Sequence, residues 1–423
     1  MLVQSLFPPQ GSVALEELKA QVAGGNVNPP FDAGVVEACI ELSQRLLRDP
    51  IARRYPELLA LGFWMRKTEL HRLRQQFDLL QRDDRLLVPC GLVFHLPPRN
   101  VDTMFVYSWL LSALTGNCNV IRLSPQRSES TAALLRLFSE TLAQASPSAK
   151  QGTWIVSYGH EEEPTQAFSS ICDMRVIWGG DHTVSTIRQI PLSPHAREIV
   201  FADRFSLSAI DAASYLDLNE SGRSVLARQF FDDSFWFDQM ACSSPRLVVW
   251  CGKQNHAAGA SADFFPRVND YAVLRQEVQP AQCMHRFLSS SLAILDRPVT
   301  NYRRFPALSV LTLSDLEEFD RNHPGGEVFF ECRVERLEEI TPALRRRDQT
   351  LTWFGFGTDE LRRLVTALNQ ILDDFENSRS FNGPQWRNEA QWNLIDAARD
   401  AVENDVDAFW AEVQGALGIP ITL

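Results

Sequence analysis

The sequence has no closely spaced pair of cysteines. Its eight cysteines are scattered through 423 residues, and no C-x-x-C pair or cysteine–histidine cluster has the spacing of a zinc site. This pattern predicts reduced thiols, no metal centre and a cytoplasmic protein. The first residues also lack the charged and apolar regions of a signal peptide.

Long apolar runs and an excess of positive charge are also missing. The longest apolar region, residues 104–114, is too short to cross a bilayer and contains Tyr107 and Ser108, so we expect no membrane span. Acidic residues outnumber basic ones by 53 to 41, for a net charge of −12. That balance argues against a nucleic-acid-binding protein held by phosphate contacts. Apolar residues make up 45% of the chain, which is typical of a globular protein with two or three domains at this length.

Apolar strand-like segments alternate with helical patterns through the middle of the chain. This alternation predicts an open parallel sheet with right-handed crossovers, a doubly wound α/β domain. We expect a dinucleotide-binding domain over residues 86–214, because ligands bind such sheets at the carboxyl ends of the strands. The predicted strands are 86–96, 119–124, 154–158, 174–178 and 205–210, and the helices lie between them.

The regions before and after this domain have other predicted structures. Residues 1–85 begin with an irregular lead-in and a short helix near 15–22, and then form a helical part that we expect to pack on the cofactor domain, with Asp32 as a helix cap. Residues 215–380 alternate again and predict a second α/β domain. Residues 381–423 are predicted to form an acidic helical tail.

No G-x-G-x-x-G follows the first strand, so an ordinary Rossmann fingerprint is missing. A dinucleotide would need other strand ends. Arg122 and Ser124 close one strand, and Gly179-Gly180 closes another and opens a helix whose free N–H groups can receive a phosphate. A plain turn is the more common use of two glycines. Asn100 follows the first strand, where its amide can cap a helix or donate to an oxyanion.

Cys242 is the residue on which we expect the chemistry to depend. It follows the aromatic run Phe235–Phe237 and precedes the apolar strand pattern of residues 246–250. Small neighbours make such a thiol approachable, and its own backbone N–H can stabilise an oxyanion. Nearby N–H dipoles should lower its pKa. The alternative is a cysteine that simply fills an apolar core.

The order of these parts resembles the aldehyde dehydrogenase superfamily, on residues 97–101, 113–124 and 176–180 and the isolated Cys242. Residues 91–96, 178–181 and 239–245 look like the long-chain fatty acyl-CoA reductases, the LuxC family. The resemblance covers roughly residues 86–360. It implies an aldehyde dehydrogenase-like α/β fold, with a doubly wound parallel-sheet cofactor domain and a second α/β catalytic domain that carries Cys242.

The resemblance also implies roles for single residues. Cys242 is the nucleophile that accepts the acyl group, and Asn100 is the side-chain oxyanion donor. Arg122 stands where the dehydrogenases usually have a lysine near the adenosine ribose. Three residues on, Pro125 replaces the glutamate that binds ribose hydroxyls in many NAD-preferring members, which together with Arg127 favours NADPH.

Further implications concern the cofactor, the reaction and its partners. Glu327 aligns loosely with the glutamate that contacts the nicotinamide ribose, and Ser124, Gly179 and Gly180 would line the cofactor site. The implied activity is NADPH-dependent reduction of an acyl thioester, from a fatty acyl-CoA or an acyl-enzyme, to an aldehyde. The implied partners are a fatty-acid-activating acyl-protein synthetase and further copies of the chain in a homo-oligomer.

The chain departs from the hydrolytic dehydrogenases in one respect. Where they carry a glutamate general base, it has Asp203-Arg204-Phe205-Ser206. This loss fits a reductase, because hydride rather than water should resolve the acyl-enzyme, and it fits a decayed enzyme equally. Two alternatives stay open, a non-reducing acyl carrier or scaffold and an aldehyde-oxidising dehydrogenase. His182 and His195 are candidate general bases, but the more common role for each is a surface residue or one on the phosphate side of the cofactor.

Overall fold

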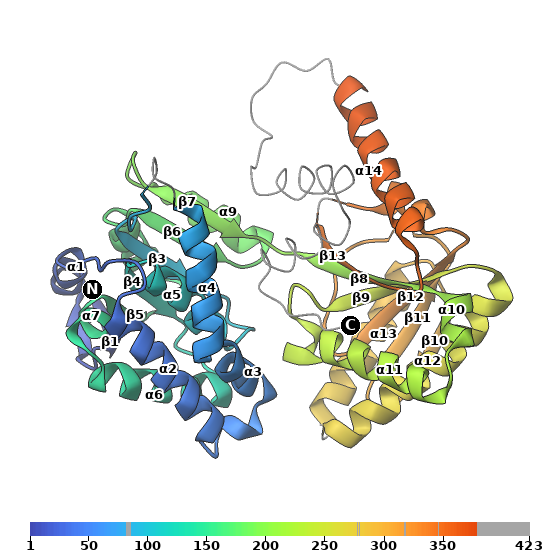
Figure 1. The fold of residues 1–423 in the computed structure, drawn as a ribbon, viewed down its shortest axis with the longest axis horizontal. Coiled ribbons are helices and arrows are strands. Elements are labelled where there is room, and N and C mark those ends of the chain that lie inside the picture. Colours follow the sequence, from blue (N-terminus) through green and yellow to red (C-terminus); the bar gives the residue numbers. More distant parts are fainter. Residues whose placement is uncertain (82–85, 277, 279, 317–318, 346, 379–423) are drawn as a thin grey trace. The chain divides into compact units, whose positions relative to one another are not determined.

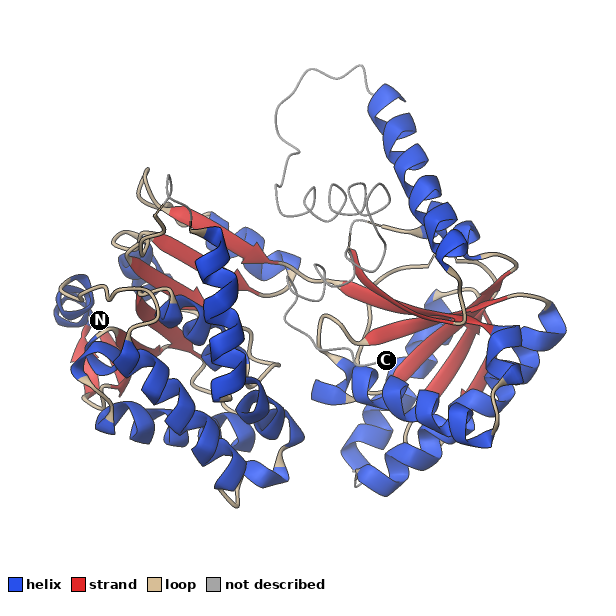
Figure 2. Ribbon diagram, viewed as in Figure 1, coloured by secondary structure: helices blue, strands red, loops and turns tan. Residues whose placement is uncertain are grey.

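The structure is a computed structural model that describes residues 1–81, 86–276, 278, 280–316, 319–345 and 347–378. The chain divides into two compact units, Met1–Asp203 and the part from Arg204 onward. Each unit has one β-sheet with helices packed on it (Figures 1 and 2). The helical tail expected over residues 381–423 lies outside the described residues. In the described part of the chain, no helix combines the length and the apolar character needed to cross a membrane.

The first unit contains a seven-stranded sheet in the order β2-β1-β5-β4-β3-β6-β7. Strands β3 to β7 are parallel, and β1 is antiparallel to both β2 and β5. The strands are β1 (Leu2–Phe7), β2 (Gly11–Ala14), β3 (Leu92–Leu96), β4 (Cys118–Leu123), β5 (Thr153–Ser157), β6 (Met174–Trp178) and β7 (Arg197–Phe201).

Helices cover both faces of this sheet, so alternate strand residues face two cores. Ile121 packs in a cluster with residues of α2, α3, α5 and α6, whereas Val120 packs with residues of α1, α8 and α9. The helices are α1 (Leu15–Ala23), α2 (Ala33–Arg48), α3 (Pro56–Trp64), α4 (Lys67–Leu80), α5 (Met104–Leu114), α6 (Glu129–Gln144), α7 (Pro147–Gln151), α8 (Glu162–Ser169) and α9 (Asp181–Arg188), with a short 3-10 turn η1 (Ala52–Arg54).

Local signals fix several of these boundaries. The Asp32 side chain accepts from the N–H groups of Gly34 and Val35, as predicted for a helix cap. The predicted lead-in was wrong, because β1 and β2 form a hairpin that extends the sheet beside β5. The sequence analysis also missed β7, whose residues alternate in exposure at the other edge of the sheet.

The second unit contains a six-stranded sheet in the order β10-β11-β12-β9-β8-β13, parallel except for the edge strand β10. Its strands are β8 (Phe205–Asp211), β9 (Pro245–Cys251), β10 (Val299–Arg304), β11 (Ser309–Leu313), β12 (Val328–Val334) and β13 (Asp348–Phe354). Its helices are α10 (Ala212–Asp217), α11 (Glu220–Ser234), α12 (Gln254–Arg275), α13 (Pro280–Asp296) and α14 (Thr358–Ser378), with 3-10 turns η2 (Trp236–Gln239) and η3 (Leu337–Ala343).

Strand β8 corrects the predicted division of the chain. We expected residues 205–210 to be the fifth strand of the cofactor sheet, with the boundary after residue 214. Instead β8 pairs with β9 and β13 in the second sheet, and the units divide between Asp203 and Arg204. A fully buried strand has a continuous apolar pattern whichever sheet it joins, so the sequence does not reveal its partners.

Candidate active site

Cys242 lies in a loop that leads from η2 into β9, and its side chain is exposed to solvent. Before it, Phe237, Asp238 and Gln239 have positive φ angles of 54°, 52° and 64°. Each such residue costs about 1–2 kcal/mol relative to the right-handed conformation. Buried Gln239 fixes the turn by donating from Nε2 to the carbonyl of Pro245 at 3.2 Å.

The backbone of Cys242 is also fixed from the neighbouring strand. Ser206, at the start of β8, donates from Oγ to the carbonyl oxygen of Cys242 at 2.6 Å. The N–H of Ser244 donates to the carbonyl of Ala241 at 3.1 Å. The loop therefore holds the main chain of Cys242 in place and leaves the thiol accessible, the arrangement needed for an attacking nucleophile.

The electrostatic surroundings of the thiol differ from the prediction. Although the Cys242 side chain is exposed, the atoms packed around the sulfur reduce its hydration and raise the pKa of the thiol above its ordinary value of 9.0. The charges of Arg246 and Arg204 and the N–H groups of Cys242 and Ser243 lower the pKa, but by less. The expected lowered pKa was therefore wrong for this state of the protein. At neutral pH most of the thiol is protonated, and only the thiolate fraction is nucleophilic.

A glycine turn packs against the Cys242 loop. The N–H of Gly326 donates to the carbonyl of Asp238 at 2.8 Å, and Gly325, Gly326 and Glu327 have φ angles of 71°, 67° and 57°. A Cβ atom on Gly325 would lie 2.6 Å from Sδ of Met240. Glycine is therefore required where the turn meets the loop.

Glu327 follows this turn and begins the approach to β12. Its side chain is buried and forms an ion pair with Arg286 of α13, with 2.9 Å between Glu327 Oε2 and Arg286 Nη1. Burial raises the pKa of the Glu327 carboxyl to about 7, although Arg286 opposes the shift. Because β9 and β12 are parallel neighbours, Cys242 and Glu327 both lie at the amino-terminal ends of the strands of the second sheet.

Sequence reasoning missed Arg286 and His323, which lie at this end of the second sheet. His323 accepts the N–H of Gly325 at Nδ1 and contacts the carbonyl of Val328 from Nε2 at 2.6 Å. This pairing makes Nε2 the donor of a neutral ring, and burial keeps the pKa of His323 well below its ordinary value. His323 therefore supports the glycine turn and does not serve as a base. The predicted candidates His182 and His195 are both exposed residues of the first unit.

In the first unit, Arg122 and Ser124 lie at the carboxyl end of β4, as predicted. The Arg122 guanidinium donates to the carbonyls of Tyr158, at 3.1 Å, and Gly159, and lies 5.3 Å from the centre of the Tyr158 ring. It shares a pocket with two more arginines, Arg99 and Arg127. Asp102 also lines this pocket, and its carboxylate accepts from the hydroxyls of two residues in the first turn of α6.

Gly179 and Gly180 end β6 and begin α9, as predicted. Gly180 is the N-cap of α9 and provides no side chain to its first N–H groups. No atom lies within 4 Å of the place where a Gly180 Cβ would be. The start of α9 therefore has no side-chain cap from Gly180 and has free space beside it, although Asp181 adds a carboxylate to its first turn; helix N-termini favour anions.

Asn100 lies in the loop after β3 and its side chain is exposed. It does not cap the next helix, because Thr103 is the N-cap of α5. Asn100 belongs to the first unit and Cys242 to the second, so their cooperation at an oxyanion stays a prediction.

Comparison with protein families gives one match. A family model for acyl-CoA reductases (LuxC) matches residues 69–282, which is half of the chain. The matched range contains Cys242, Asn100 and the strand ends at Arg122 and Gly179, and it stops before Glu327. No curated protein sequence matches the chain.

Solved structures with this fold share little sequence with the chain. A Bradyrhizobium japonicum proline utilization A (PutA) mutant is 13% identical with a TM-score of 0.59, and the match covers 84% of this chain and 40% of that one. An NADP-dependent glyceraldehyde-3-phosphate dehydrogenase from Bacillus halodurans, complexed with NADP, is 14% identical with a TM-score of 0.57, over 87% and 85% of the chains. A Thermus thermophilus 1-pyrroline-5-carboxylate dehydrogenase mutant is 14% identical with a TM-score of 0.60, over 87% and 80%. These likenesses confirm the predicted aldehyde dehydrogenase-like α/β fold.

Proposed function

The chain belongs to the LuxC family of acyl-CoA reductases, and from this premise we propose that it reduces an acyl thioester to an aldehyde through an acyl group carried on Cys242. The observation that carries the proposal is the exposed thiol on a loop whose main chain is fixed. Family membership supports an oxidoreductase that acts on acyl or aldehyde groups, and the thioester substrate and the role of Cys242 are our proposal.

In the proposed reaction, the Cys242 sulfur attacks the thioester carbonyl and loses its proton to solvent. The backbone N–H of Cys242 and the Asn100 amide stabilise the tetrahedral oxyanion. The bond to the donor sulfur then breaks, and the donor thiolate takes up a proton. The acyl group remains on Cys242 as a new thioester, so this half-reaction involves no change of oxidation state.

The second half-reaction reduces that thioester. Bound NADPH would supply a hydride to the carbonyl carbon and leave as NADP, while the carbonyl oxygen would take a proton from solvent. The resulting thiohemiacetal on Cys242 breaks its C–S bond and releases the aldehyde and the free thiol. The chain has no glutamate where hydrolytic dehydrogenases carry a base, which supports resolution by hydride rather than by water.

The residues at the strand ends of the first unit fit a dinucleotide phosphate. The start of α9 is uncapped and sterically open at Gly180, which suits the pyrophosphate. The pocket with Arg122 and Arg127 supplies positive charge for a 2′-phosphate, and Pro125 removes the carboxylate that would repel it. These features support NADPH over NADH, with Ser124 and Gly179 completing the site and Glu327 near the nicotinamide ribose.

The deciding experiment is single-turnover oxidation of NADPH with a panel of acyl-CoAs, in the wild type and in Cys242→Ala. We expect oxidation that requires both the thioester and Cys242, and transfer of a radiolabelled acyl group to the wild type but not to Cys242→Ser. Labelling that persists in Cys242→Ser would refute the assignment of the nucleophile. Acyl loading with no oxidation would favour the non-reducing carrier. Turnover of aldehyde and NADP without CoA would favour an aldehyde oxidiser.

The acyl donor and the assembly belong to the same proposal. We propose that the donor is a fatty acyl-CoA or the acylated form of a fatty-acid-activating acyl-protein synthetase, and that the chain forms a homo-oligomer in the cytoplasm. Mixing the protein with each donor in the labelling experiment would distinguish the two sources.

A further inference from the structure

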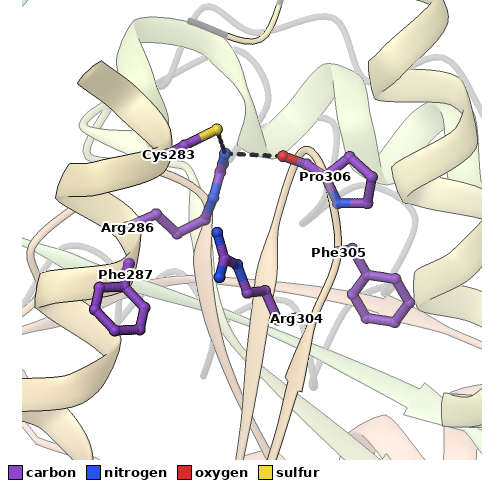
Figure 3. Close-up of a pocket in the computed structure, with 6 residues that line it drawn as sticks. All are labelled: Cys283, Arg286, Phe287, Arg304, Phe305 and Pro306. Atoms are coloured by element: carbon purple, nitrogen blue, oxygen red, sulfur yellow. Dashed lines mark hydrogen bonds between the residues drawn. The ribbon is translucent and has the colours of Figure 1, made fainter. Parts of the chain in front are cut away.

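Arg286 occupies an unusual position for an arginine, because its side chain is 5% exposed. It projects from the second turn of α13 and donates to main-chain carbonyls just before β11, those of Ala307 and, at 3.1 Å, Pro306. Figure 3 shows the guanidinium between Cys283 and Pro306, with Arg304 beside it on the same pocket. The remaining strong contact of Arg286 is the ion pair with Glu327.

Glu327 depends on this ion pair. Among the residues that the structure describes, Arg286 is its one ion-pair partner. A buried carboxylate without such a partner is costly to keep ionised. The left-handed backbone of Glu327 after two glycines fixes where its side chain begins, and Arg286 fixes where the carboxylate ends.

The same stretch of α13 contacts the Cys242 loop. Gln282 donates from Nε2 to Oδ1 of Asp238 at 3.0 Å, and the His285 ring lies where a Cβ of Gly326 would be. One face of α13 thus touches both the loop that carries the nucleophile and the turn that carries Glu327. All of these residues belong to the second unit.

We propose that Arg286 is a positioning residue that favours the charged form of the Glu327 carboxylate and directs it toward a ribose hydroxyl of the bound cofactor. The inference rests on the proposed function, because it takes Glu327 as a cofactor contact. Arg286 itself does not touch the cofactor. It acts through Glu327, while its carbonyl contacts hold its own guanidinium in place.

The charges around Glu327 set the direction of the pH effect. Burial raises its pKa to about 7, Arg286 lowers it, and Asp238 raises it. His285 flanks the turn, and His323 is held neutral beneath it. Cofactor affinity should therefore rise as the pH increases through about 7 and Glu327 ionises. Without Arg286 the pKa rises further, and the affinity profile should move to higher pH.

The pocket beside Arg286 makes a sharper test possible. It has a volume of about 260 Å³ and is lined by Cys283, Phe287, Arg304, Phe305 and Pro306 as well as Arg286. Truncation in Arg286→Ala extends this space up to Glu327. Guanidinium ion added at millimolar concentration can then enter and replace the missing charge, whereas urea, which has a similar shape and no charge, cannot.

The experiment measures NADPH affinity by fluorescence titration from pH 6 to 9, beside acyl loading on Cys242 without cofactor. We expect Arg286→Ala to bind NADPH on the order of tenfold more weakly at pH 7, with its profile displaced to higher pH, partial rescue by guanidinium and normal acyl loading. Arg286→Lys should retain most of the affinity. Arg304→Ala removes an arginine from the same pocket without touching Glu327, and should match the wild type.

Other results would overturn the inference. Unchanged affinity and pH profile in Arg286→Ala would do so, as would equal loss of affinity and acyl loading with no pH displacement and no rescue. If Arg286→Ala does not fold, Glu327→Gln decides, because its NADPH affinity should be lower and nearly independent of pH around 7. A Glu327→Gln protein with wild-type NADPH affinity and pH profile would overturn this inference but not the proposed function. A wild type that does not bind NADPH would overturn the proposed function as well.

Discussion

The candidate site of the first sheet lies at the carboxyl ends of its strands, and that of the second sheet lies at the amino ends. The two sites are also built from different kinds of structure. In the first unit, the expected cofactor residues follow β4 and β6 at the carboxyl ends of the strands. In the second, Cys242 and Glu327 precede β9 and β12 at the amino ends. The first site uses open backbone at Gly180 and the arginines of the pocket at the end of β4, and the second uses left-handed turns and a buried ion pair. An anion can bind to existing N–H groups, whereas a nucleophile must be held in a fixed geometry.

The largest expected difference between the units is their response to pH. Burial lowers the pKa of His95 in the first unit to about 4. Between pH 6.5 and 4 only the unfolded chain binds this proton, so the first unit loses stability as the pH falls. Burial raises the pKa of Glu327 to about 7. Between pH 4.5 and 7 only the folded chain keeps this proton, so the second unit loses stability as the pH rises. Each effect is at most roughly 3 kcal/mol.

Hydrogen exchange, followed separately in each unit from pH 4 to 7.5, checks this contrast. His95→Gln should flatten the acid side of the profile in the first unit, and Glu327→Gln should flatten the rise with pH in the second. The other unit of each variant is the control. Because His323 is also held neutral in the second unit, the informative quantity is the difference between variant and wild type. If neither substitution changes how the stability of its own unit depends on pH, the predicted opposite pH responses of the two units are wrong.

A second prediction compares one glycine from each site. A Cβ on Gly325 would lie 2.8 Å from the backbone oxygen of Asp238, which cannot easily move, and the φ of Gly325 is +71°. Gly325→Ala should therefore destabilise the second unit by about 2 kcal/mol and slow acylation of Cys242. Gly180→Ala meets open space and should cost less than about 1 kcal/mol, mainly because alanine is a poorer N-cap than glycine. Urea unfolding of both variants measures the difference, and equal losses would contradict it.

The same contrast explains what the sequence could predict. The strand at residues 174–178 and the position of Cys242 between a helix and a strand follow from local patterns, and the structure has both. The Arg286–Glu327 pair joins residues 41 positions apart, and an arginine in a mixed helix gives no sign of such a partner. The three left-handed residues before Cys242 include Phe237 and Gln239, neither of which favours that conformation. Tertiary contacts hold them there, so local patterns could not reveal the turn.

A third prediction concerns the open site alone. The Arg127 guanidinium is exposed and lines the pocket at the end of β4, where we expect the 2′-phosphate. Arg127→Ala should raise the KM for NADPH about tenfold and leave that for NADH unchanged. Arg53→Ala, at an exposed arginine of the same unit outside the pocket, is the control. An equal rise in KM for NADPH and NADH would mean that Arg127 contacts a group that the two cofactors share.

The smallest effect is expected at the thiol itself. Arg246 is the charged residue that most lowers the pKa of Cys242, against the larger effect of burial. Arg246→Met should raise that pKa further and reduce the thiolate fraction, which slows alkylation of Cys242 by iodoacetamide at pH 7.5. Since Arg246 opposes the effect of burial only in part, we expect a reduction of about two- to fivefold, which corresponds to roughly 0.4–1 kcal/mol. Arg246→Lys should keep most of the rate, and Cys90, an exposed thiol of the first unit, should react equally in all variants. An unchanged Cys242 rate would mean that the backbone N–H groups and Arg204 oppose the effect of burial without Arg246, and that the second site depends less on buried charge than the ion pair at Glu327 suggests.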